Sequence, residues 1–121
     1  MRDFRGLKVW RRAHGVALDI YKATGPFPRG ELFGLTSQMR RAAVSVAANI
    51  AEACGRTGER EFARFLNISL GSASELEYHL LLAHDLRLLP DPDHERLASE
   101  VTNIKRMLAG LIRTLRSKAP S

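Results

Sequence analysis

Apolar residues recur every three or four positions along almost the whole chain, and three groups of helix-breaking residues interrupt them. This spacing places side chains on one face of an α-helix, whereas a half-buried strand would need strict alternation. The interruptions lie at residues 25–30, 55–58 and 89–93, and each holds proline or glycine. The pattern therefore predicts four amphipathic helices joined by short connections.

The helices are expected over about residues 5–23, 31–53, 58–88 and 93–117. Gly55 is well placed to end the second helix, and Thr57 to cap the third. Helices of this length with short connections pack as antiparallel neighbours. We therefore expect residues 1–121 to form a single all-α domain, an up-down-up-down antiparallel four-helix bundle.

One apolar stripe on each predicted helix marks the expected core. The first stripe ends with Ile20 and Tyr21, the second begins with Leu32 and Leu35, and Leu108 lies in the middle of the fourth. With 45% hydrophobic and 26% charged residues, the chain has the composition of a globular protein rather than a disordered one. A single shared core is the expected result.

The lone cysteine, Cys54, excludes an intramolecular disulfide and favours a cytoplasmic location. Its place at a helix C-terminus disfavours a thiolate, so we expect a small apolar side chain rather than a nucleophile. No apolar run follows the basic N-terminus, and neither export nor a membrane partner is expected.

Catalytic and metal sites find little support. No histidine has a glutamate three residues before it, which argues against a di-metal site in the bundle core. The cysteine and histidines also lack the spacing of a zinc site. A nucleophile, an oriented base and oxyanion donors cannot be assembled from these residues. We expect no enzyme, no metal and no cofactor.

A row of polar residues lies beside the apolar stripe of the second helix, and a second row lies on the third. The rows comprise Gln38, Arg41, Ser45, Asn49 and Glu52, and Ser72 and Glu75. Folding the antiparallel pair about residue 56 brings Arg41 level with Glu75, so the two could meet. The rows are either a structural network that fixes helix register or a ligand or catalytic site, and we favour the network.

Several ordered motifs are similar to those of a known family. They are Phe27-Pro28, the run from Glu31 to Leu35, the run from Arg40 to Glu52, and Gly71-Ser72 with Glu75-Leu76-Glu77. In these motifs the chain resembles the bacterial four-helix bundle proteins of 23S ribosomal RNA intervening sequences (S23-type), which are related to accessory subunits of diversity-generating retroelements. The resemblance covers nearly the whole chain.

The resemblance implies a homopentameric ring without enzymatic activity. It also implies RNA or DNA, or a nucleic-acid enzyme such as a reverse transcriptase, as partners. The family usually has glycine directly after its Asn-Ile-Ala-Glu run, whereas here Ala53 and Cys54 come before Gly55. The turn into the third helix is therefore expected to differ slightly.

The second predicted helix carries little charge. From Gly34 to Ala53 only two arginines and one glutamate are charged, and four alanines extend the apolar surface beyond the core stripe. Such a helix is buried on more than one side. The sequence therefore predicts a homo-oligomer.

The net charge of +6 comes from 19 Lys and Arg against 13 Asp and Glu. In the predicted topology the start of the first helix, the connection at 55–58 and the C-terminus share one end. That end holds eleven cations and four anions, giving 11 − 4 = +7, and the remainder holds 8 − 9 = −1. Arg2 and Lys118 belong to the eleven, and the anions are Asp3, Glu52, Glu59 and Glu61.

An excess of this size at one end predicts that nucleic-acid backbones bind there. The expected contact residues are Arg5, Lys8, Arg11, Arg12, Arg56, Arg60, Arg64, Arg113 and Arg116. The alternative is an oligomeric adaptor for other proteins that does not bind nucleic acid, because surface charge also serves solubility.

Overall fold

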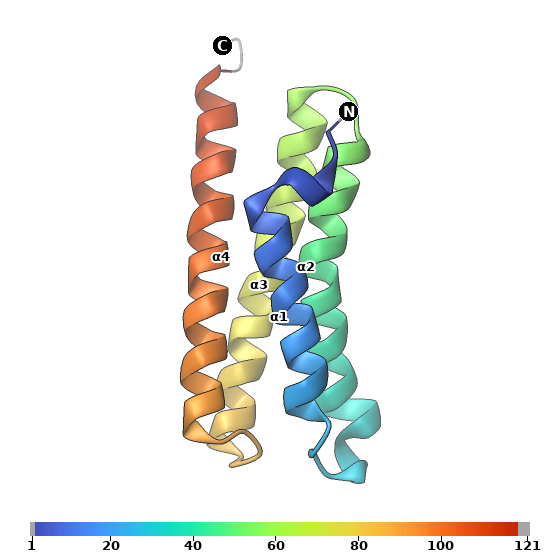
Figure 1. Ribbon diagram of the computed structural model, residues 1–121, viewed down its shortest axis with the longest axis vertical. Coiled ribbons are helices and arrows are strands. Elements are labelled where there is room, and N and C mark those ends of the chain that lie inside the picture. Colours follow the sequence, from blue (N-terminus) through green and yellow to red (C-terminus); the bar gives the residue numbers. More distant parts are fainter. Residues whose placement is uncertain (1, 119–121) are drawn as a thin grey trace.

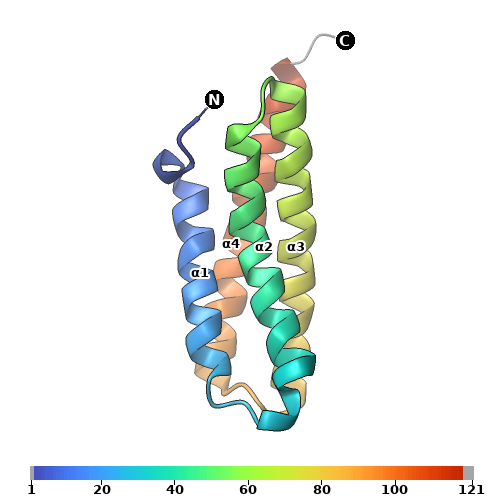
Figure 2. The same cartoon turned by 90° about the vertical axis from the view of Figure 1, so that its right-hand side faces the viewer.

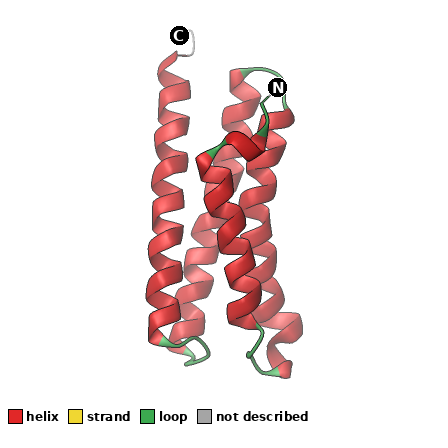
Figure 3. Cartoon of the chain, in the orientation of Figure 1, coloured by secondary structure: helices red, strands yellow, loops and turns green. Residues whose placement is uncertain are grey.

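Four long helices account for most of the chain in a computed structural model, which describes residues 2–118 (Figure 1). They are α1 (Lys8–Thr24), α2 (Ser37–Gly55), α3 (Glu59–Asp85) and α4 (Asp91–Lys118). Short helical turns precede α1 and α2: η1 (Phe4–Gly6), η2 (Arg29–Glu31) and η3 (Leu32–Thr36). The described part contains helices and loops and no strand (Figure 3), so the predicted all-α fold is confirmed.

Each helix runs antiparallel to the next, and α2 and α4 each lie between α1 and α3. The N-terminal segment, the α2–α3 turn and the end of α4 lie at one end of the bundle (Figure 2), which we call the basic end. The backbone N–H of Arg2 donates to the carbonyl of Cys54 at 3.0 Å and holds the N-terminal segment against the end of α2. The topology therefore matches the up-down-up-down expectation.

The start of α2 differs from the sequence-based expectation. Gly34 has non-helical backbone angles, φ −117° and ψ −113°, inside the π-type turn η3, and regular helix begins only at Ser37. A π-type turn changes the residue register, so side chains before it leave the stripe that follows it. Leu32, expected in the core, is 45% exposed for this reason, whereas Leu35 is buried.

The cap of α3 also differs. Gly58 precedes the helix with a positive φ of 86°, and no side chain accepts a hydrogen bond there, so the prediction of a Thr57 cap was wrong. Glycine adopts this left-handed region without steric cost. The acidic residues Glu59 and Glu61 do lie in the first turn, where negative charge complements the helix dipole. The helix then ends at Asp85, three residues before the expected end.

The core runs along the bundle axis and contains the predicted stripes almost completely. Ile20, Ile50, Leu66 and Leu108 are fully buried, each with a relative exposure of 0%. Tyr21 is the second exception after Leu32, because it lies 49% exposed at the edge of α1. Both exceptions lie near the end opposite the basic end.

Replacing Leu108 with aspartate is predicted to unfold the domain. The substitution would bury an unpaired carboxylate and remove a fully buried side chain, at a cost of about 4 kcal/mol or more. Such a cost is comparable to the total stability of an ordinary domain. The helical circular dichroism signal should be largely lost at 25 °C, and an unchanged thermal midpoint would contradict the core assignment.

Candidate nucleic-acid interface

The basic end collects cations from four segments far apart in the sequence. Arg5 precedes α1, Lys8 and Arg11 lie in its first turn, Arg56 lies in the α2–α3 turn, and Arg113 lies near the end of α4. Arg60 and Arg64 lie in the first two turns of α3, and Arg116 lies in the last turn of α4. The side chain of Lys118 lies outside the described part.

Four arginines at this end pair with carboxylates. Arg2 contacts Glu59 at 2.6 Å, and Arg64 contacts Glu61 at 2.9 Å. Looser pairs join Arg56 to Glu52 and Arg5 to Asp3, each at 3.5 Å. The hydrogen bond from Arg64 lowers the pKa of the Glu61 carboxyl, so this anion stays charged near neutral pH. These pairs reduce the local charge that a ligand meets.

Three of the guanidinium groups at this end also cover phenylalanine rings of α3. Arg2 lies 3.9 Å from the centre of the Phe62 ring, which is buried. Arg56 and Arg64 lie 4.7 and 4.5 Å from the centre of the Phe65 ring. Cations over aromatic faces gain electrostatic attraction. These arginines therefore serve the fold at this end in addition to carrying charge.

Five predicted cations at the basic end form no ion pair within residues 2–118, and all five are exposed: Lys8, Arg11, Arg60, Arg113 and Arg116. Arg11 instead donates one guanidinium N–H to the carbonyl of Arg5 at 3.0 Å. Reaching a phosphate would cost these groups no intramolecular ion pair. They are the strongest candidates for contact with a polyanion.

Arg12, predicted at the basic end, forms an ion pair lower in the bundle. It contacts Glu100 of α4 at 3.2 Å, and Glu100 lies about 14 Å from the start of a helix about 42 Å long. Arg12 thus lies beside the middle of the bundle, because α1 is short and begins below the α2–α3 turn (Figure 2). The sequence-based placement of Arg12 at the basic end was therefore wrong, and Arg12 is removed from the charge count of that end.

The polar rows of α2 and α3 meet at their centre. The hydroxyls of Ser45 and Ser72 are 2.8 Å apart, and Asn49 donates to both the hydroxyl and the carbonyl of Ser45 at 3.0 and 2.9 Å. Ser69 of α3, which is fully buried, donates to the carbonyl of Val46 at 2.7 Å. These bonds join the two helices in one register.

The ends of the polar rows do not meet as expected. Arg41 donates to Gln38 of its own helix at 3.0 Å, and no ion pair joins it to Glu75 within the described residues. Glu75 instead lies 3.5 Å from His79 one turn later. Glu52 likewise pairs within its own segment, with Arg56.

Buried polar groups near the network do not form a catalytic arrangement. Burial lowers the pKa of His79, an effect that Glu75 opposes and Arg41 adds to, so the imidazole is neutral at pH 7. Cys54 is buried, and burial raises the pKa of its thiol, which agrees with a structural role. Within residues 2–118, no three ligating side chains converge on a metal position.

Two comparisons place the chain among known proteins. A family model described as 23S rRNA-intervening sequence protein matches residues 5–110. The chain belongs to this family.

A solved member of the S23 ribosomal protein family supports the assignment. This protein of unknown function from Bacteroides thetaiotaomicron VPI-5482 superposes with a TM-score of 0.80 at 26% sequence identity. The superposition covers 87% of our chain and 95% of the other chain. A search of curated proteins found no match. Neither the family nor its solved member indicates an enzymatic activity.

Within the described residues, no helix is both long and apolar enough to cross a bilayer.

His79 is predicted to make the stability of this family member pH-dependent. Its pKa is lowered in the folded state, so the unfolded chain binds the proton more readily. The stabilisation is present above the ordinary pKa of 6.5 and is lost as the pH falls below this value toward the lowered pKa of the folded state. His79→Gln should therefore show a smaller fall in thermal midpoint between about pH 7.5 and 5.5 than the wild type. A fall in the His79→Gln variant as large as in the wild type would contradict this prediction.

Proposed function

We propose that this family member is a non-enzymatic, cytoplasmic, oligomeric accessory protein that binds RNA or DNA backbones through its basic end. The observation that carries the proposal is the group of five exposed cations without an ion pair, Lys8, Arg11, Arg60, Arg113 and Arg116. Phosphate contacts dominate non-specific affinity for nucleic acids. The five cations come from three helices, and Arg60, Arg113 and Arg116 lie nearest the tip of the basic end, whereas Lys8 and Arg11 lie lower along the bundle because α1 begins below the α2–α3 turn.

Binding through this surface is expected to depend little on base sequence. Contacts to phosphates carry no sequence information, and stacking of bases on exposed aromatic rings adds affinity for single strands with little sequence preference. At the basic end, Phe62 and Phe65 are buried, and the half-buried ring of Phe4 is covered by the guanidinium of Arg5 at 4.5 Å. The available contacts are therefore electrostatic, as suits an accessory protein that holds a nucleic acid for a separate enzyme.

Charge reversal at the basic end is predicted to abolish most binding. Arg60→Glu, Arg113→Glu and Arg116→Glu together lower the net charge by six, from +6 to 0. Affinity for a single-stranded RNA and a DNA duplex, measured by fluorescence anisotropy at fixed salt, should fall by about tenfold or more. These positions avoid Arg56 and Arg64, whose reversal would also uncover Phe65.

The matched control reverses three exposed cations near the opposite end, Lys22, Arg29 and Arg87, with the same change in net charge. This control should retain most of the affinity if position decides binding. Equal losses in both variants would show that only net charge matters, and full binding by the first variant would refute the basic end as the site. Circular dichroism should show both variants folded.

The oligomeric part of the proposal is supported by the outer face of α2. Val44 is 44% exposed, and Ala48 is exposed beside it. An apolar groove of about 410 Å³ runs between α1 and α2 over Trp10, Leu18 and Ala48. Exposed apolar side chains that lie together beside an apolar groove favour an interaction site. The second candidate function is an oligomeric adaptor that does not bind nucleic acid. Such an adaptor would use this same apolar face for its protein contacts.

Light scattering at micromolar concentration is predicted to report an oligomer. The resemblance to S23-type proteins sets the expectation of five copies, close to five times 13.5 kDa. A different closed ring would exclude only the pentamer, whereas a monomer would refute the assembly. Retained assembly together with no affinity for any nucleic acid would select the adaptor function.

A further inference from the structure

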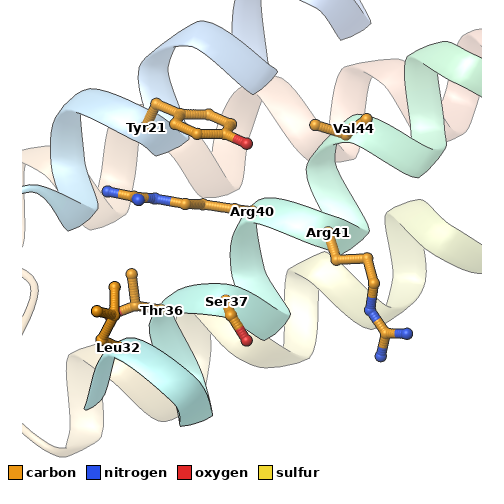
Figure 4. A pocket seen from close by; sticks show the side chains of 7 residues that line it. All are labelled: Tyr21, Leu32, Thr36, Ser37, Arg40, Arg41 and Val44. Carbon is orange, nitrogen blue, oxygen red and sulfur yellow. The ribbon is translucent and has the colours of Figure 1, made fainter. Parts of the chain in front are cut away.

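A second groove between α1 and α2 lies near the end opposite the basic end and contains an arginine. Figure 4 shows Arg40 extended across it, with Tyr21 on one side and Leu32 and Thr36 on the other. The groove has a volume of about 330 Å³, and Val44 closes its far side. We call it the Arg40 groove.

The guanidinium of Arg40 is fixed in place by groups that leave its outer nitrogens available. Its Nε donates to the hydroxyl of Thr24 at 2.9 Å, and that hydroxyl donates to the carbonyl of Ile20 at 2.7 Å. The guanidinium lies 4.7 Å from the centre of the Tyr21 ring. Its terminal N–H groups have no hydrogen bond or ion pair within residues 2–118. A guanidinium held this way is preorganised for a carboxylate.

The groove around Arg40 is mostly apolar and incompletely covered, and Ser37 and Arg41 also line it. Tyr21, Leu32 and Val44 are each between 44 and 49% exposed. Two of these, Tyr21 and Leu32, belong to the helical stripes that the sequence assigns to a core. The hydroxyl of Thr36 is buried without a hydrogen-bond partner in the described part. The groove therefore fits a carboxylate carried on an apolar protein surface.

The exposed face of α3 carries such a surface. Tyr78 and Leu81 are 59 and 49% exposed, and the side chain of Glu75, one turn before Tyr78, is half exposed. We call these three residues the α3 patch. In contrast to the glutamates that pair with arginine, Glu75 contacts only the neutral His79 within the described residues. The patch offers a carboxylate beside two uncovered apolar side chains.

The α3 patch and the Arg40 groove lie at the same height along the bundle. The contact between Ser45 and Ser72 gives a common reference level. From it, Arg40 lies five residues toward the start of α2, about 7.5 Å away, and Glu75 and Tyr78 lie about 4.5 and 9 Å along α3 in the same direction. A rotation about an axis parallel to the bundle keeps these heights equal. α1 and α3 also lie on opposite sides of α2 (Figure 2).

We propose that the Arg40 groove of one copy receives the α3 patch of a second copy, with Glu75 of that copy bound by Arg40. The contact is head-to-tail, because each copy offers its groove on one side and its patch on another, and such contacts form a ring when the rotation between copies closes. The proposal rests on the oligomer proposed above and adds the surfaces and the ion pair that join its copies. It does not involve the basic end.

A charge swap tests the pairing. Arg40→Glu and Glu75→Arg should each place like charges at the contact, so light scattering at micromolar concentration should show a shift toward monomer. Combining both substitutions restores opposite charges and should restore most of the wild-type mass. Arg29→Glu, an exposed cation at the same end that does not line the groove, is the control and should leave assembly unchanged.

A surface substitution guards against effects on folding. Tyr78→Arg changes an exposed position that carries no core contact and should also shift the protein toward monomer while circular dichroism stays as in the wild type. Normal assembly of the folded Arg40→Glu and Tyr78→Arg variants would overturn this interface while leaving the oligomer standing. A double variant that is folded and monomeric would overturn the Arg40–Glu75 pairing. A monomeric wild type would instead refute the oligomer itself.

Discussion

The contact between α2 and α3 determines most of the geometry of this protein. Small residues face each other there, which lets the hydroxyl of Ser69 reach the carbonyl of Val46 at 2.7 Å and the hydroxyls of Ser45 and Ser72 approach to 2.8 Å. These bonds favour one register, since a shift would leave the fully buried hydroxyl of Ser69 unpaired at a cost of about 1–3 kcal/mol and would also break the half-buried contacts of Ser45 and Ser72. That register places the α2–α3 turn, and the heights of Arg40 and Glu75 depend on it as well.

Helical periodicity is a local property, and for this reason the four helices, their antiparallel order and the core stripes were predictable from sequence. Two of the errors occur where the backbone conformation departs from a regular helix. The non-helical angles of Gly34 leave Leu32 exposed. At the start of α3, Gly58 with its positive φ takes the N-cap position that was predicted for Thr57. The conformation of these two glycines could not be predicted from the residue pattern, because other glycines of this chain lie inside regular helices.

The candidate interface was predictable only in outline. Topology alone places cations from distant segments at one end, but it does not tell which of them pair. Arg64 and Glu61 pair within one turn, as residues three apart on a helix commonly do. The contact of Arg12 with Glu100 joins residues 88 positions apart and depends on the short length of α1. The sequence thus locates the basic end, and the fold separates its available cations from its paired ones.

The central claim is that this family member binds nucleic acid by neutralising phosphates at its basic end. The dependence of affinity on salt tests it most directly, because each phosphate contact releases counterions and contributes a slope of about −0.7 to −0.9 to a plot of log K against log salt. Five exposed cations per copy predict a slope of about −3 or steeper for the wild-type oligomer. A slope near zero, or no measurable binding at about 50 mM salt, would contradict the claim.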